Sequence, residues 1–78
     1  MNLEQFISDS LDVKIKTLYI EGEFIVSIRY YKYKVNLYLL KGHYFEVFYN
    51  HKEDRIERID PLDFDHSRMN FYYDQIKI

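Results

Sequence analysis

Seventy-eight residues are enough for one small domain, and the absence of cysteine excludes disulfides and thiolate metal sites. The net charge of −2 gives the chain no long-range positive field. No apolar run approaches the ~20 residues of a transmembrane helix, and residues 1–13 lack the basic start of a secretory signal. We therefore expect one domain over residues 1–78, located in the cytoplasm and without a membrane partner.

Charge is distributed unevenly along the chain. Residues 24–45 contain four basic residues and no acidic one, whereas residues 1–23 and 46–78 each carry an excess of three acidic residues. Either the acidic flanks neutralise the basic centre in the folded domain, or the centre presents a positive sheet face to an anionic partner. The negative net charge favours the first interpretation.

The pattern of residues 2–11 predicts a short amphipathic helix. Asn2 is a suitable N-cap, and Gln5 follows at the spacing of a capping box. Its apolar stripe consists of Leu3, Phe6, Ile7 and Leu11. A helix of this length is unstable alone, so we expect it to pack on a sheet.

Residues 13–20 are interpreted as a strand. Val13 and Ile15 alternate with lysines, and the apolar phase then shifts to Leu18 and Ile20, which requires a bulge or a second buried face. The pair at 21–22 predicts a hairpin turn, because its glycine tolerates positive φ.

The segment from residue 24 to residue 49 alternates between apolar and polar positions and holds nine of the fifteen Phe and Tyr residues. Such alternation indicates half-buried antiparallel strands. The phase changes near Tyr33, so residues 24–40 form either one bulged strand or a hairpin. We favour a turn at 30–33, because one strand of seventeen residues would exceed the usual ~3–10. A second turn is expected at 41–43, followed by a strand at 44–49.

Charged residues dominate 55–59, which suits an edge strand, and Pro61 is expected to end it. After this strand we expect a connector and a C-terminal helix. Residues 66–77 are consistent with this helix, since Met69, Tyr72 and Ile76 follow helical spacing, although alternation in the same stretch leaves a strand as the alternative.

These elements predict an α+β fold. A small antiparallel meander sheet of four to five strands carries a short N-terminal helix and a C-terminal helix on one face. The other face is expected to remain partly open, because two short helices can hardly cover both sides of the sheet.

A run of tyrosines and lysines is the most unusual local feature: Tyr30, Tyr31, Lys32, Tyr33 and Lys34. Alternating rings and amines suit the bases and phosphates of single-stranded nucleic acid. The same run is also typical of a hairpin end, where rings pack across strands and lysine stems cover apolar surface. Nucleic-acid binding is therefore the alternative functional hypothesis.

Titratable side chains offer only weak indications of chemistry. The histidines that could contribute to a metal site, and the aspartates that could act as acids or bases, are His43, His51, His66, Asp60, Asp63 and Asp65. The histidines lack the helical pairing of a zinc motif, and the aspartates fit a proline turn and a helix start. We expect no enzyme activity, no catalytic residue, no metal and no cofactor.

Apolar surface suggests protein interaction as the main hypothesis. Both phases of residues 35–49 contain large apolar side chains, and an open aromatic patch is typical of a protein contact. The candidate contact residues are Tyr38, Tyr44, Glu46 and Phe48. The expected partner is another protein or a second copy of the chain, which would make a homo-oligomer.

Overall fold

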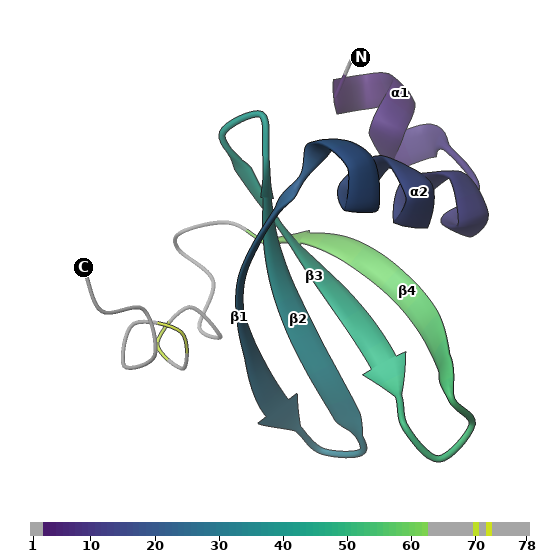
Figure 1. Cartoon of the computed structure of the whole chain (residues 1–78), viewed down its shortest axis with the longest axis vertical. Coiled ribbons are helices and arrows are strands. Elements are labelled where there is room, and N and C mark those ends of the chain that lie inside the picture. Colours follow the sequence, from purple (N-terminus) through teal and green to yellow (C-terminus); the bar gives the residue numbers. More distant parts are fainter. Residues whose placement is uncertain (1–2, 63–69, 71, 73–78) are drawn as a thin grey trace.

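The described residues form a four-stranded antiparallel sheet preceded by two helices (Figure 1). The computed structural model describes residues 3–62, 70 and 72. The elements are α1 (Leu3–Ser8), α2 (Leu11–Glu21), β1 (Glu23–Tyr30), β2 (Tyr33–Leu40), β3 (His43–Asn50) and β4 (Arg55–Leu62). The strand order β1-β2-β3-β4 confirms the predicted α+β meander.

Two-residue turns join the first three strands. Tyr31 and Lys32 separate β1 from β2, which confirms the hairpin and excludes the single bulged strand. Tyr31 has a φ of 57°. Glycine or asparagine usually occupies such a position, and the sequence has neither at this turn. At the second turn, Lys41 and Gly42 both have positive φ, 51° and 79°, as the twist of a tight hairpin requires.

The predicted strand at 13–20 is wrong, because these residues form most of α2. The Ser10 side chain caps the helix by accepting a hydrogen bond from the Val13 N–H at 3.4 Å. Leu11, Ile15 and Leu18 then fall on one face at helical spacing and pack on the sheet. The phase shift in the sequence was therefore helical periodicity and not a bulge.

Gly22 ends α2 rather than forming a hairpin turn. Its φ of −86° is ordinary, so positive φ is not why glycine stands there. Its N–H donates to the Leu18 carbonyl at 3.0 Å, and a Cβ at this position would lie 2.7 Å from that oxygen. Residue 22 therefore lies too close to the Leu18 carbonyl for any side chain, and glycine is required there.

The edge position of β4 is confirmed, but Pro61 does not end the strand. β4 continues to Leu62, and Pro61 pairs with Phe45. An edge strand accommodates proline because every second N–H points away from the sheet. The predicted C-terminal helix falls mostly outside the described residues; Asn70 and Tyr72 are described, and both have helical backbone.

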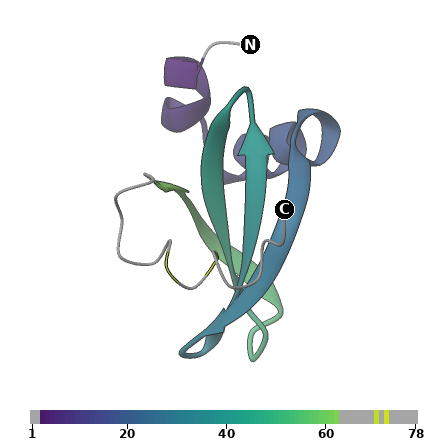
Figure 2. The same ribbon diagram turned by 90° about the vertical axis from the view of Figure 1, so that its left-hand side faces the viewer.

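One face of the sheet, which we call the helix face, packs against α1 and α2. Figures 1 and 2 show both helices at one end of the strongly twisted sheet. The buried core on this face consists of Phe6, Leu18, Leu40, Phe45, Val47 and Ile59. The rings of Phe6 and Phe45 meet edge to face at 4.8 Å, so α1 is held by an aromatic contact as well as by apolar burial.

The opposite face, which we call the second face, is also buried at its centre. Its fully or nearly fully buried side chains include Val35, Leu37, Glu46, Phe48, Leu62 and Tyr72. Tyr72 packs with Leu37 and Leu62, so it covers the face that the N-terminal helices leave free. The expectation of an open second face is therefore wrong at its centre, while the packing of the predicted C-terminal helix lies mostly outside the described residues.

The Lys41–Gly42 turn allows a direct test of backbone strain. An added Cβ at Gly42 meets no atom within 4 Å, so Gly42→Ala acts only through its φ of 79°. We expect Gly42→Ala to lower the free energy of unfolding by about 1–2 kcal/mol, and Gly42→Asn to cost less, because asparagine tolerates this conformation. Urea denaturation measures both; an equal loss in the two variants would contradict the explanation.

Candidate functional site

The four residues predicted to contact a partner do not form one surface. Tyr38 pairs with Phe45 and lies on the helix face, whereas Tyr44, Glu46 and Phe48 lie on the second face. Glu46 and Phe48 are completely buried, and the two tyrosines are half-buried. Glu46 and Phe48 are therefore out of reach of a partner in this fold.

The Tyr30–Lys34 run is likewise divided. Tyr33 packs edge to face on Phe48 at 5.5 Å on the second face, while Lys34 lies on the helix face beside Arg29. The Tyr30 and Tyr31 rings contact each other at 4.6 Å. Tyr31 lies in the turn and is 87% exposed. The run thus offers no continuous platform on which successive bases could stack.

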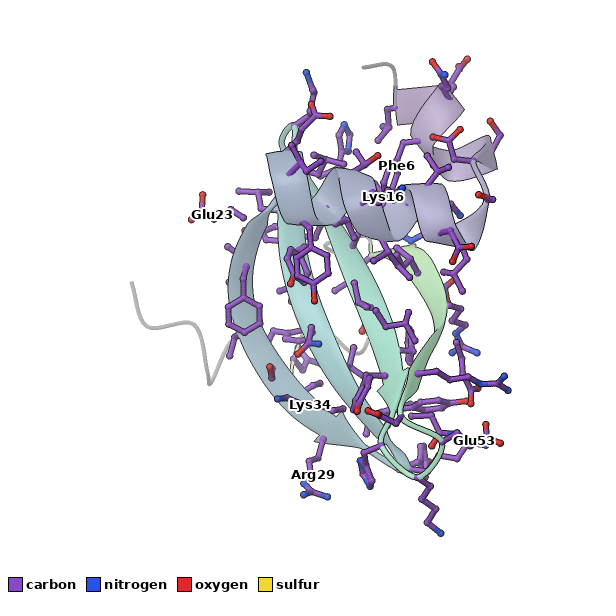
Figure 3. The ribbon with its side chains drawn as sticks, turned by 45° about the vertical axis from the view of Figure 1, so that its right-hand side comes forward. Phe6, Lys16, Glu23, Arg29, Lys34 and Glu53 are labelled. Atoms are coloured by element: carbon purple, nitrogen blue, oxygen red, sulfur yellow. The ribbon has the colours of Figure 1, made fainter. Side chains whose placement is uncertain are left out.

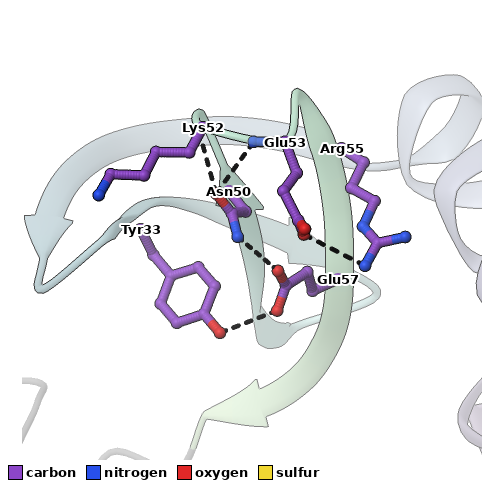
Figure 4. A network of polar contacts seen from close by, with 6 residues as sticks. All are labelled: Tyr33, Asn50, Lys52, Glu53, Arg55 and Glu57. Atoms are coloured by element: carbon purple, nitrogen blue, oxygen red, sulfur yellow. Dashed lines mark hydrogen bonds and ion pairs between the residues drawn. The ribbon is translucent and has the colours of Figure 1, made fainter.

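Tyr33 also belongs to a polar network that closes the loop between β3 and β4 (Figure 4). Its hydroxyl donates to Glu57 Oε1 at 2.9 Å, and Asn50 Nδ2 donates to Glu57 Oε2 at 2.6 Å. Asn50 Oδ1 accepts from the backbone N–H groups of Lys52 and Glu53. These bonds satisfy a nearly buried amide and hold the turn, which is a structural role.

The described residues provide no support for a metal site. Within residues 3–62, 70 and 72, no three His, Asp or Glu side chains gather closely enough to hold an ion. His43 and His51 are exposed, and Asp60 forms an ion pair with Arg58 at 2.9 Å. The other candidate histidine and aspartates, at 63, 65 and 66, lie outside the described residues. Neither helix of the described part is long and apolar enough to cross a bilayer.

The two edges of the sheet differ in how well they are protected. Four of the eight residues of β4 are charged, and Pro61 and an extra residue at Glu57 interrupt its regular pairing. Such features discourage pairing with another chain. β1 has no proline, its bulge lies at Ile25, and its charges lie only at Glu23 and Arg29, leaving a regular uncharged stretch over residues 26–28. The sequence carried this signal, but the edge position of β1 was not predicted.

Exposed aromatic surface adjoins the start of β1. Tyr19 on α2 and Phe24 on β1 are 73% and 52% exposed, although both are large and apolar. The Phe24 ring lies 5.7 Å from that of Tyr38, edge to face, and burial together with the nearby Tyr19 raises the pKa of Tyr38. We call these three residues the aromatic shelf; it borders the unprotected edge.

No protein-family model, curated protein sequence or solved structure matches this chain at a significant level. Its function must therefore be argued from its own geometry. Two features of the geometry are candidates for function. One is the edge of β1 with the neighbouring aromatic shelf, and the other is the pair of basic side chains Arg29 and Lys34 on the helix face.

Glu57 makes stability depend on pH. Hydrogen bonds from Asn50 and then Tyr33 lower its pKa below the usual 4.5, against an opposing effect of burial. A carboxylate with a lowered pKa stabilises the fold above about 4.5 and loses this effect as the pH falls through its folded-state value. We expect Glu57→Gln to be less stable than the parent at neutral pH, and the difference to shrink in acid.

Urea denaturation from pH 7 to pH 3 measures this difference, and Tyr33→Phe serves as a control because it removes one of the two bonds. Tyr33→Phe should show an intermediate pH dependence. Parallel pH profiles for the parent and Glu57→Gln would rule out Glu57 as the source.

Tyr72 is tied to the second face by a buried hydrogen bond, in which its hydroxyl donates to Glu46 Oε2 at 2.8 Å. We expect Tyr72→Phe to lower the free energy of unfolding by about 1–3 kcal/mol, because a buried oxygen loses a donor. In a Glu46→Leu background the same substitution should cost much less. A double-mutant cycle measures this coupling; additive losses would show that the bond contributes nothing.

Proposed function

We propose that this chain is a non-enzymatic self-association module, and that β1 of one copy pairs antiparallel with β1 of a second copy. The single observation that carries the proposal is the contrast between the two edges of the sheet. β4 has four charged residues, a proline and a bulge, which discourage pairing, whereas residues 26–28 of β1 have no charge, no proline and no bulge, since the bulge of β1 lies at Ile25.

Antiparallel geometry identifies the backbone groups that β1 would offer. A two-residue hairpin closes on a hydrogen-bonded pair, here Tyr30 with Tyr33, and bonded and non-bonded pairs then alternate along the strands. Arg29 and Ser27 fall at non-bonded pairs, so their N–H and C=O groups point away from β2. Two residues on each copy are therefore available for pairing.

One register uses all of these groups. If Ile28 of one copy lies opposite Ile28 of the other, each Ser27 faces the Arg29 of its partner copy, and the two pairs exchange four hydrogen bonds. A register centred on Arg29 would place like charges face to face, and one centred on Ser27 would reach into the bulge near Phe24. The central register avoids both problems and joins the two sheets into one.

The same register brings exposed apolar side chains to one level. Phe24 of one copy then lies opposite the hairpin tip of the other, where Tyr31 is 87% exposed. These are two of the most exposed large apolar side chains of the described residues, and their contact would add apolar burial to the edge hydrogen bonds. Because the pairing is two-fold, the contact occurs twice.

Ser27 allows a matched test of this pairing. Ser27→Pro removes the outward N–H, whereas Ser27→Ala keeps it; both lose the side-chain bond to Asn36 Oδ1 at 2.6 Å. Because the N–H points away from β2, proline should be tolerated there as Pro61 is in β4. We expect the parent and Ser27→Ala to dimerise and Ser27→Pro to be monomeric with an unchanged circular dichroism spectrum.

Sedimentation velocity over a range of concentrations measures the association. A parent chain that stays monomeric at its highest workable concentration would overturn the proposal, as would equal association of the alanine and proline variants. Hydrogen exchange of the parent gives a second measurement that needs no variant. The Ser27 and Arg29 amides should become more protected as concentration rises, and unchanged protection would contradict edge pairing.

A further inference from the structure

Two basic side chains of the central segment, Arg29 and Lys34, have no ion-pair partner among the residues that the structure describes. The ion pairs of the described residues join Arg55 to Glu53 and Arg58 to Asp60, within the last part of the chain. Lys32 is different, because its charge helps to lower the pKa of Glu57 in the acidic flank. Over residues 3–62, 70 and 72, the acidic flanks therefore supply no ion pair to Arg29 or Lys34.

Arg29 and Lys34 stand side by side as register partners on β1 and β2. Both are exposed, and Figure 3 shows them at the end of the sheet away from α2, on which Lys16 lies. Like charges directly opposite each other on neighbouring strands repel and destabilise the pairing. An anion bound between them would remove this cost.

A hollow of about 350 Å³ joins these two side chains to the next loop. Ser27, Ile28, Arg29, Lys34 and His51 line it, and no carboxylate is among them. Arginine presents a planar fork of donors that matches phosphate oxygens, and lysine adds a compact charge. The hollow is near the lower limit of small-molecule sites, which suits a phosphate group and little more.

A second hollow of about 500 Å³ shares Lys34 with the first. It is lined by Tyr19, Lys34, Asn36, Tyr49, Asp54, Arg55 and Ile56. The Tyr49 hydroxyl donates to Asp54, and this bond raises the pKa of Tyr49, so the ring is held at the wall of the hollow. Tyr19, which lies on α2, also lines the hollow and is 73% exposed. Two rings therefore border the space next to the phosphate-sized hollow.

We infer that the two adjoining hollows of the helix face bind a phosphate monoester that carries a planar organic group, as a nucleotide does. Arg29, Lys34 and His51 hold the phosphate, and the planar group lies in the adjoining hollow against Tyr49 and Tyr19. A phosphate monoester carries a charge of about −1.5 to −2 at neutral pH, which matches the two cations better than a single carboxylate would. All the residues that line the two hollows belong to one copy of the chain, so the site does not require the proposed dimer.

Titrations with three probes test the site: inorganic phosphate, adenosine 5′-monophosphate and adenosine, each followed by amide chemical shifts. We expect saturable shifts around Arg29, Lys34 and His51 with both phosphates, tighter binding of the nucleotide, and at least about tenfold weaker binding of adenosine. The double variant Arg29→Gln/Lys34→Gln should weaken nucleotide binding by at least about tenfold.

The control Lys16→Gln/Lys41→Gln removes the same charge from exposed positions outside both hollows and should bind the nucleotide as the parent does. An equal loss in the control would show that only net charge matters and would overturn the site. Absence of saturation with both phosphates, or adenosine binding as tight as the nucleotide, would also overturn it. Sedimentation of the parent without ligand measures the dimer separately from the nucleotide titration, so failure of one proposal can be distinguished from failure of the other.

Discussion

The turn at Lys41 and Gly42 fixes the register of the sheet, and the register decides which side chains share a face. Across this turn each pair joins an even-numbered residue to an odd-numbered one. Tyr38 therefore faces the core beneath α2, whereas Phe48 faces away from it. A slip of one residue in β3 would turn Glu46 into the apolar core under the helices. The two positive-φ residues of this turn thus specify both layers of the core.

Alternation in the sequence was sufficient to locate β1, β2 and β3, although burial itself alternates only in part of β2, since residues 45–48 of β3 are buried on both faces of the sheet. It failed at α2, where Val13, Thr17 and Ile20 have the composition of a strand. Tertiary packing overrides that preference, since Leu11 and Leu18 lie against the sheet. Ser10, the N-cap of α2, is the local signal for a helix that the strand interpretation of residues 13–20 overlooks.

The prediction that the four candidate contact residues share one surface is wrong for a different reason. Its residues were grouped by phase within separate strands, but phase carries across a hairpin only when the register of the turn is known. Burial of the second face also depends on Tyr72, which lies 26 residues after Glu46 in the sequence. A pairing that distant leaves no periodic signal. The unprotected edge, by contrast, was visible in residues 26–28 once the strand order was known.

The two proposals use different parts of the same strand, since the dimer needs the β1 backbone and the ligand needs the Arg29 side chain. In the proposed register, each Arg29 lies opposite Ser27 of the other copy, so the two basic hollows meet near the two-fold axis. Bringing them together raises the repulsion between cations, which opposes pairing in the absence of an anion. A phosphate bound at the inferred site would lower that repulsion, and linkage would then require that ligand and dimer stabilise each other. Charge on the helix face would in this way set how strongly an otherwise apolar edge associates.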